Sequence, residues 1–496
     1  MGDLSSASSE KIVDSTGLIV CPGFIDSHSH SDTYLLLEPS AASKIYQGIT
    51  TEICGNCGAS AAPLLGSYKM PSDWLDKDYS HLPTRTTGGP PTPPWSTVAD
   101  YRTLYNEISP AINAALLVGH NTLHAGTCGY EPRSATPIEI KKMVLTLEQA
   151  LDEGAIGLSS GLAYPPGSAV EREELVDLCK VVAQHNGIYT THMRSESNEL
   201  LEAIDEAIDI AARADARLQI SHLKASTPPN WHKIDAAFEK IRSAQSTLKI
   251  GADRYPYTAG STDLDIVLPQ WATYGGRDAI LERLRTSSVR KKIRGELVDC
   301  PPGRWDRVMV GSTRFEEFKG KYLPEIAKAL KMDTVDALLY LIDQDDLKTG
   351  GIFFGMSEEN LMRVLAEPYV SIGSDGSMRA PRGPLSSDHP HPRSYGSHSR
   401  FLRIALDGKT VPLPEAIRKM TALPAEQFGL KKRGLLKEGY AADILIFHPL
   451  EICENSTYAQ PHQLSSGMHH VFVNGTHTVQ NGKYTDMRSG AFLSHS

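Results

Sequence analysis

The chain has 496 residues, 40% of them hydrophobic, which is enough for several domains or for one barrel with attachments. Its 59 acidic and 50 basic residues give a net charge of −9, and no basic run is present, which argues against nucleic acid as a partner. Membrane-spanning and signal-peptide patterns are absent and seven cysteines are sparse for this length, so we expect a cytoplasmic protein with reduced thiols and no membrane partner.

Short apolar runs alternate with helical patterns along most of the chain, which is typical of a parallel α/β architecture. Amphipathic helices are predicted at 137–153, with Thr136 as N-cap, and at 171–185 and 196–214. Eight parallel strands with helices between them predict a (β/α)8 TIM-like barrel. The predicted strands are 23–28, 50–55, 114–119, 155–160, 188–192, 217–222, 249–255 and 369–375.

Two segments interrupt the alternation. Residues 64–98 are rich in Pro, Gly, Thr and Ser and predict a long loop after the second strand. Residues 259–340 are too long for a simple connection, contain helical patterns at 277–286 and 289–298, and predict an inserted subdomain. After about residue 430 the chain becomes rich in turns and short strands, and it predicts a small β domain.

Two histidines, His28 and His30, end the first predicted strand. Residues two apart on a strand point to the same side, so the two imidazoles converge and could share a metal ion. Taken alone, such a pair is as consistent with two surface histidines as with a metal site. The interpretation therefore depends on what ends the other strands.

Four further candidates follow predicted strands: Cys57, His192, His222 and Asp375. Each alone has an ordinary explanation, as a core histidine, a buried thiol or a turn aspartate. In a barrel, however, the carboxyl ends of the strands face one cavity, and imidazole and thiolate are good zinc ligands. Cys54 and Cys57 do not make a zinc ribbon, because no second pair with this spacing exists.

These residue types indicate metal-assisted hydrolysis of an amide or related bond. A bound divalent metal lowers the pKa of its water to about 7 and polarises a carbonyl. An adjacent carboxylate can take the proton of that water and pass it to the leaving group, and Asp375 is the candidate for this role.

The pattern resembles the amidohydrolase superfamily. The segment 55–58, Gly-Asn-Cys-Gly, resembles the branch in which a cysteine replaces a bridging carboxylated lysine, the N-acyl-D-amino-acid deacylases or D-aminoacylases. The resemblance covers nearly the whole chain. Further matching stretches are 157–166, 221–224, 255–262, 391–393 and 461–463.

This resemblance implies a zinc enzyme that hydrolyses N-acyl-D-amino acids, with a metal-bound water as nucleophile and Asp375 as general base and acid. It implies a tight zinc site of Cys57, His192 and His222, and a possible weaker site of His28 and His30 that shares Cys57. The substrate's α-carboxylate would be held by Lys224, Tyr255 and Arg393, with help from Ser261.

Relatives of this kind also carry strands before the first histidine pair, which join the C-terminal strands in one β-sandwich. Here the first barrel strand is predicted at residue 23, so the N-terminal part of the sandwich is expected to be shortened. The expected domains are 1–21 as a sandwich remnant, 22–430 as the barrel with its insertion at about 259–340, and 431–496 as the C-terminal sandwich strands.

Two alternatives stay open: a cyclic-amide hydrolase of the dihydroorotase or hydantoinase kind, and an inactive amidohydrolase-fold binding protein. Residues 263–269 contain no basic residue, which favours a neutral or apolar substrate side chain over D-glutamate or D-aspartate. A small-molecule substrate is the expected partner, and the oligomeric state stays undetermined.

Overall fold

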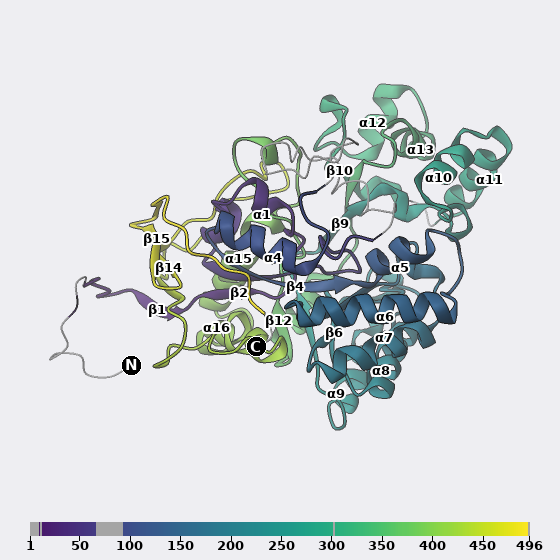
Figure 1. The fold of residues 1–496 in the computed structure, drawn as a ribbon. Helices are drawn as coiled ribbons and strands as arrows, with labels where there is room; N and C mark the ends of the chain where they lie inside the picture. The colour runs from purple at the N-terminus through teal and green to yellow at the C-terminus, as the bar shows by residue number, and fades with distance from the viewer. Residues whose placement is uncertain (1–8, 10–11, 66–92, 301–302, 495–496) are drawn as a thin grey trace.

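A parallel barrel forms the centre of the molecule in the computed structural model, which describes residues 9, 12–65, 93–300 and 303–494 (Figure 1). Its eight strands follow the order β12-β8-β7-β6-β5-β4-β3-β2. They are β2 Phe24–Asp26, β3 Ile49–Cys54, β4 Asn113–Gly119, β5 Gly157–Gly161, β6 Ile188–His192, β7 Arg217–Ile220, β8 Ile250–Arg254 and β12 Val370–Ile372. Each overlaps one predicted strand, so the predicted barrel is confirmed.

The barrel closes between its two edge strands, β2 and β12. The backbone N–H of Ser27 donates to the carbonyl of Ile372 over 3.2 Å, and that of Asp375 donates to the carbonyl of His28 over 2.8 Å. A Cβ on Gly373 would lie 2.5 Å from the Cβ of His28, so this close approach requires glycine. The closure therefore places the ends of the first and eighth strands side by side.

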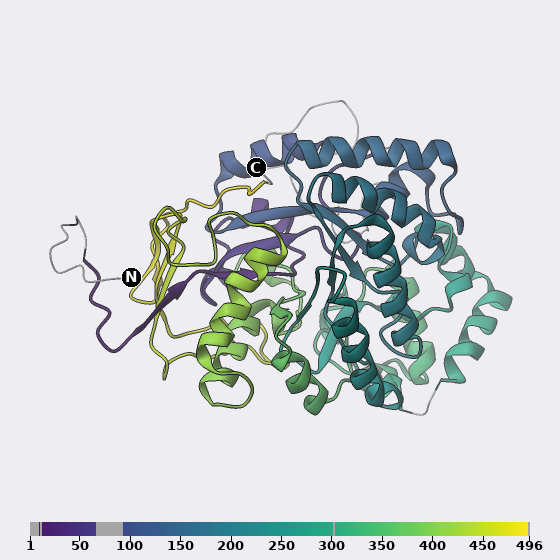
Figure 2. The same ribbon diagram turned by 90° about the horizontal axis from the view of Figure 1, so that it is seen from below.

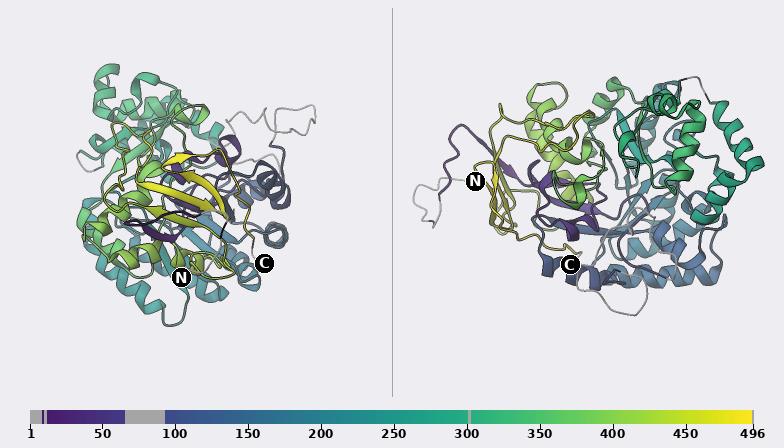
Figure 3. Two further views of the ribbon diagram at one scale, coloured as in Figure 1. Left: turned by 90° about the vertical axis from the view of Figure 1, so that its left-hand side faces the viewer. Right: turned by 90° about the horizontal axis from the view of Figure 1, so that it is seen from above.

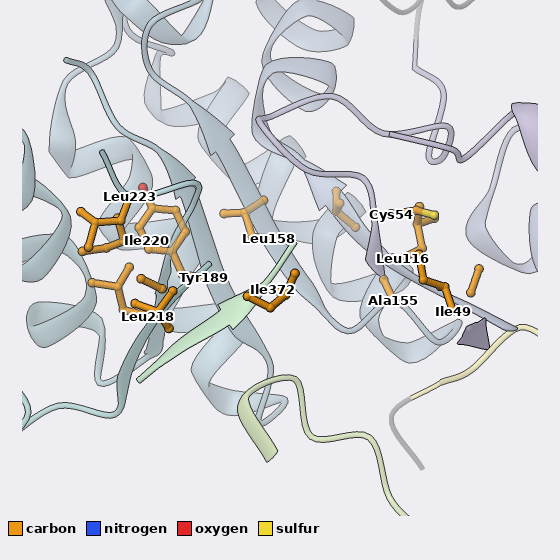
Figure 4. Packing of buried hydrophobic residues seen from close by; sticks show 14 of the residues in the cluster. Ile49, Cys54, Leu116, Ala155, Leu158, Tyr189, Leu218, Ile220, Leu223 and Ile372 are labelled. Atoms are coloured by element: carbon orange, nitrogen blue, oxygen red, sulfur yellow. The ribbon is translucent and has the colours of Figure 1, made fainter. Parts of the chain in front are cut away.

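Both faces of the central strands are covered, so polar residues such as the threonines of β3 and the serines of β5 are buried together with the apolar ones. All residues of β3, β4, β5, β6 and β8 are buried, as expected of parallel strands under helices. Figure 4 shows part of this layer, with Leu116, Leu158 and Tyr189 among the labelled side chains.

Helices surround the barrel, and the predicted N-cap of α6 is present, since Thr136 and Glu139 form a capping box. Figures 1 and 2 show α6, α7 and α8 packed along the outside of the strands. None of the helices in the described residues is long and apolar enough to cross a membrane. The helices around the barrel are α1 Tyr34–Leu37, α2 Ala42–Ile45, α4 Val98–Ile108, α5 His120–Cys128, α6 Pro137–Asp152, α7 Arg172–Gln184, α8 Leu200–Ala214, α9 Ile234–Ala244, α14 Glu358–Ala366, α15 Arg393–Leu406, α16 Leu413–Met420 and α17 Ala422–Gln427.

A long excursion leaves the barrel after β8 and has its own core of residues such as Leu284, Ile293 and Leu338. It begins at β9 (Ala259–Asp263) and returns along β11 (Gly350–Phe354), which pairs with β9 antiparallel. Residue 340, which the sequence indicated as the approximate end of the insertion, lies inside α13 (Thr334–Gln344). The other elements of the excursion are α10 Gly276–Arg285, α11 Ser287–Val298, β10 Val308–Val310 and α12 Leu323–Leu330.

A five-stranded antiparallel sheet lies at one end of the molecule (Figure 3). Its strand β1 (Ile19–Pro22) pairs with β13 (Ile444–Phe447), so the start of the described chain joins the C-terminal strands. The remaining strands are β14 Met468–Val473, β15 Thr476–Gln480 and β16 Lys483–Tyr484. The predicted loop at 64–98 lies mostly outside the described residues, and the domain boundaries stay predictions.

Candidate active site

Four predicted residues meet at the carboxyl ends of the barrel strands. Donor atoms of His28, Cys57, His222 and Asp375 all lie within 4.8 Å of one another. The Cys57 Sγ is 3.4 Å from Nε2 of His28 and 3.5 Å from Nε2 of His222. The closure of the barrel brings these residues together, because they follow β2, β3, β7 and β12.

Two carboxylates behind the cluster orient its histidines. The Nδ1 of His28 lies 3.1 Å from Asp253 Oδ1, and the Nδ1 of His222 lies 2.6 Å from Glu196 Oε1. Asp253 also accepts the backbone N–H of His222 over 2.8 Å. With each Nδ1–H directed at a carboxylate, both Nε2 lone pairs face Cys57, which is how metal-binding histidines are commonly held.

Neither of these two carboxylates was predicted from the sequence. Asp253 and Arg254 are two charged residues inside an otherwise apolar strand, and that unusual position was an available signal. Glu196 follows His192 by four residues in the loop after β6, which gives no distinctive pattern.

The donor set fits zinc. Burial alone would raise the pKa of the Cys57 thiol, but the surrounding histidines, His28 and His192 foremost, hold it well below its usual value. A thiolate with imidazole nitrogens is a typical zinc environment. The His192 ring centroid lies 4.5 Å from that of His222, and its Nδ1 is buried with no hydrogen-bond partner among the described residues. Donor atoms of His192, Glu196 and His222 lie within 4.8 Å of one another, so His192 adjoins the cluster through His222.

Asp375 is held in place from both sides of its carboxylate. Its Oδ1 lies 3.1 Å from His30 Nε2 and 3.4 Å from His28 Nε2, while its Oδ2 accepts a hydrogen bond of 2.6 Å from Arg393. Burial would raise the pKa of Asp375, but Arg393 and His222 lower it well below its usual value. The group is therefore an ionised carboxylate beside the donor atoms of the cluster.

Three residues of the site have backbone conformations that residues other than glycine rarely adopt. The φ angles of Cys57, His222 and Asp375 are 53°, 38° and 50°. Such conformations cost about 1–3 kcal/mol each and are concentrated at functional sites. The surrounding contacts must therefore hold the three residues in place.

The predicted substrate-binding residues form the wall next to this cluster. The Tyr255 ring centroid lies 5.9 Å from Lys224 Nζ and 5.0 Å from Arg393 Cζ. Burial would raise the pKa of Tyr255, but the cations around it, led by Lys224, lower it. Arg393 donates to the backbone carbonyl of Ser261 over 2.9 Å, so Ser261 contributes its main chain to this wall. Lys224 pairs with Glu196.

A second histidine group lies between α5 and α7. Buried His120 and His124 are 2.8 and 2.7 Å from the same Glu174 oxygen. Their other ring nitrogens are buried and have no hydrogen-bond partner in the described parts of the chain. A metal bound on the Glu174 side would leave two buried N–H groups unpaired, whereas neutral rings that donate to Glu174 leave only lone pairs. The group is thus explained by hydrogen bonding alone.

The chain is similar to known proteins over its whole length. The model of the amidohydrolase family matches residues 11–347 and 370–479. The D-aminoacylase of Alcaligenes xylosoxydans xylosoxydans is 35% identical over 498 residues, which cover 100% of this chain and 91% of that protein.

Two solved structures have the same fold over the whole chain, each with a TM-score of 0.82 and coverage of 100% of this chain and 93% of the other. One is a D-aminoacylase, 33% identical, studied for the role of its binuclear metal centre, with one-metal activation and second-metal attenuation. The other is the N-acyl-D-glutamate deacylase of Bordetella bronchiseptica, 31% identical, complexed with zinc and a phosphonate inhibitor that mimics the tetrahedral intermediate of the reaction.

Proposed function

This chain belongs to the N-acyl-D-amino-acid deacylase (D-aminoacylase) family of amidohydrolases, and from that premise we propose that it hydrolyses N-acyl-D-amino acids to a carboxylate and a free D-amino acid, with Asp375 as general base and acid. As a member of this family it is a metal-dependent amidohydrolase. The observation that carries the proposal is the approach of two oriented histidines to the Cys57 thiolate, with the Asp375 carboxylate at the same point.

Zinc would be held by Cys57, His192 and His222, and a second, weaker site would use His28 and His30 with Cys57 shared. When bound, zinc supplies Lewis-acid chemistry, which polarises the amide carbonyl and makes water more acidic. The related Bordetella deacylase structure contains zinc, which supports this choice of metal.

The residues of the chain then move the protons. Asp375 accepts a proton from the attacking water and later donates it to the amide nitrogen, so that the C–N bond breaks and a neutral amine leaves. Its lowered pKa keeps it ionised before the attack. Arg393 fixes one carboxylate oxygen, so the other, beside His30, is the oxygen available to the water.

The substrate's α-carboxylate would lie between Lys224, Tyr255 and Arg393. Arg393 uses one N–H for Asp375 and one for the Ser261 carbonyl, and a guanidinium has five, so donors remain for a substrate anion. Charge-assisted hydrogen bonds of this kind fix both the position and the orientation of the amide beside the metal.

We propose a neutral or apolar side chain on the D-amino acid. The segment 263–269, which begins at the last residue of β9, contains no basic residue to pair with a second carboxylate. Relatives that match this chain include both a D-aminoacylase and an N-acyl-D-glutamate deacylase, so sequence identity alone does not select the side chain. Faster turnover of N-acetyl-D-glutamate than of N-acetyl-D-methionine would contradict this preference.

The test of the reaction is amine release from N-acetyl-D-methionine and its L-enantiomer by zinc-loaded protein. We expect turnover of the D-form only, and a loss of about 10²–10⁴-fold in kcat for Asp375→Asn. Asp388→Asn is the matched control, because Asp388 lies on the loop after Asp375 and pairs with Arg379 at 2.7 Å.

Other outcomes would select other functions. Hydrolysis of a hydantoin or dihydropyrimidine without turnover of the linear amides would favour the cyclic-amide alternative. Folded, zinc-bound protein that cleaves neither class would favour a binding protein.

A further inference from the structure

A buried lysine contacts the loop after β12, which contains Asp375. Lys44 on α2 has no exposed surface, and its Nζ donates to Asp26 Oδ2 over 2.8 Å, to Ser374 Oγ over 3.0 Å and to the carbonyl of Gly376 over 3.0 Å. An ammonium group has three hydrogens, and each has an acceptor here. Two of the acceptors belong to the residues immediately before and after Asp375.

Asp26 completes this arrangement from the first barrel strand. Its Oδ1 accepts the backbone N–H of Ser374 over 2.7 Å and that of His28 over 3.3 Å. Its Oδ2 accepts the Ser374 hydroxyl over 2.6 Å. Asp26 and Lys44, which we name the Lys44–Asp26 clamp, therefore contact both neighbours of Asp375 and the backbone of a metal-site histidine.

The clamp lies where the two edge strands of the barrel share few backbone contacts. Asp375 has a φ of 50°, and its own N–H is bonded to the carbonyl of His28. In the described residues the edge strands β2 and β12 form no continuous ladder; they are joined by the two backbone hydrogen bonds described above and, just beyond their ends, by a bridge between Ser29 and Gly376. Asp375 has a strained backbone and lies where the edge strands are weakly paired, so it keeps its conformation only if nearby groups fix the backbone.

Stability alone gives little reason for a charge at this position. A buried ion pair often contributes no more than well-packed apolar residues of the same volume. Burial alone would lower the pKa of Lys44, but Asp26 and Glu52, whose Oε2 lies 3.3 Å from Nζ, raise it, so the ammonium stays charged. The geometric result of this charge is a fixed backbone on both sides of Asp375.

We propose that the Lys44–Asp26 clamp is a positioning device that sets the backbone of Asp375, and thereby the place of its carboxylate in proton transfer. The clamp touches neither substrate nor metal, and it acts through Asp375. This inference rests on the proposed deacylation for its kinetic readout, but its structural readout is independent of any activity.

The experiment compares Lys44→Met with wild-type protein at matched zinc content. We expect kcat for N-acetyl-D-methionine to fall about 100-fold, since a misplacement of about 1 Å can cost this much. KM and zinc content should stay within about twofold of wild type, because the residues that bind substrate and metal are untouched. Lys44→Arg, which keeps the charge, should recover part of the lost kcat.

Lys419→Met is the matched control. Lys419 is also a lysine with no exposed surface, but it lies on α16 and donates to the carbonyl of Glu367, which precedes β12 at the opposite end of the barrel. Its removal should leave kcat unchanged. Folded Lys44→Met protein with wild-type kcat and KM would overturn the proposal.

Two measurements cover the remaining outcomes. If Lys44→Met does not fold, Ser374→Ala removes the hydroxyl that both members of the clamp contact and leaves their charges paired, and we expect about tenfold lower kcat at unchanged KM. If the wild-type protein cleaves no N-acyl-D-amino acid, the proposed function fails on its own. A crystal structure of Lys44→Met or Ser374→Ala then decides the inference, because φ of Asp375 should leave the left-handed region, and a φ still near 50° would overturn it.

Discussion

The two carboxylates behind the proposed metal-binding histidines, Asp253 and Glu196, both orient histidine rings, but one lies on a strand and the other in a loop. Asp253 is fully buried in strand β8 and holds His28, the backbone of His222 and, over 3.2 Å, the side chain of Gln219. Glu196 lies in the loop after β6, its side chain is 14% exposed, and it is shared between His222 and Lys224. The strand-borne carboxylate is fixed by its surroundings, whereas the loop-borne one links the metal site to the substrate-binding wall.

Because Asp253 and Glu196 have different partners, changes near each of them should have different effects on the site. Changes on the Asp253 side should reduce metal binding and chemistry together. Loss of the Glu196 carboxylate should weaken metal binding and strengthen substrate binding. The following predictions test that separation, beginning with the largest effect.

Asp253→Asn should have the largest effect. The amide cannot hold two histidine positions as the carboxylate does, so we expect zinc affinity to fall about 100-fold and activity to fall with it. Zinc titration against a chromophoric chelator measures this change. Asp345→Asn is the control, since Asp345 is a buried aspartate of the excursion that accepts the Thr349 hydroxyl over 2.6 Å. Unchanged zinc affinity in Asp253→Asn would show that the histidines do not need this partner.

Lys224→Met should act chiefly on substrate binding, although Lys224 Nζ also lies 2.9 Å from His222 Nδ1. Removing a charge-assisted hydrogen bond to the α-carboxylate costs roughly 1.5–3 kcal/mol, so KM should rise at least tenfold. Zinc affinity should be retained, because Glu196 still contacts His222. Initial rates over a range of N-acetyl-D-methionine concentrations, with a parallel zinc titration, measure both quantities. A parallel loss of zinc would break the separation between metal site and substrate wall.

Glu196→Gln should give two smaller effects of opposite sign. Zinc affinity should fall about tenfold, because a carboxylate partner of a ligand histidine is lost. KM should decrease, because Lys224 loses its competing carboxylate and becomes available to the substrate. Glu206→Gln is the control, as Glu206 is a partly buried glutamate on α8 paired with Arg194 at 3.0 Å. A rise in KM would contradict the proposed sharing of Lys224.

Lys419→Met should have the smallest effect on function. It tests a buried lysine that donates to a backbone carbonyl, that of Glu367, instead of a carboxylate. Burial lowers the pKa of Lys419 to about 7, whereas the unfolded chain has a lysine pKa of about 10.4. Between these values the unfolded state binds more protons, so this residue makes stability rise with pH.

The variant removes that dependence. Its free energy of unfolding should exceed that of wild type by about 1–2 kcal/mol near pH 6, and the difference should shrink as the pH approaches 10. Urea unfolding from pH 6 to 10 measures it. A difference that does not change with pH would contradict the lowered pKa.

The predictable part of the fold came from local patterns. The alternation of short apolar runs with amphipathic helical patterns predicted all eight strands, because covered strands are rich in apolar residues, even where they also bury polar ones as β3 and β5 do, and the helices around them have one apolar side. The return of the excursion at β11 was not predictable, since it depends on antiparallel pairing with β9, far away in the sequence.

The sequence by itself determined which chemistry the site can contain, because His28, Cys57, His222 and Asp375 each follow a strand and barrel topology brings strand ends together. Only the tertiary structure decided how these groups are oriented. The contacts of His28 with Asp253 and of Lys44 with Ser374 join residues 225 and 330 positions apart. Such pairs leave no local pattern, since they are set by the closure of the barrel and not by the neighbours of either residue.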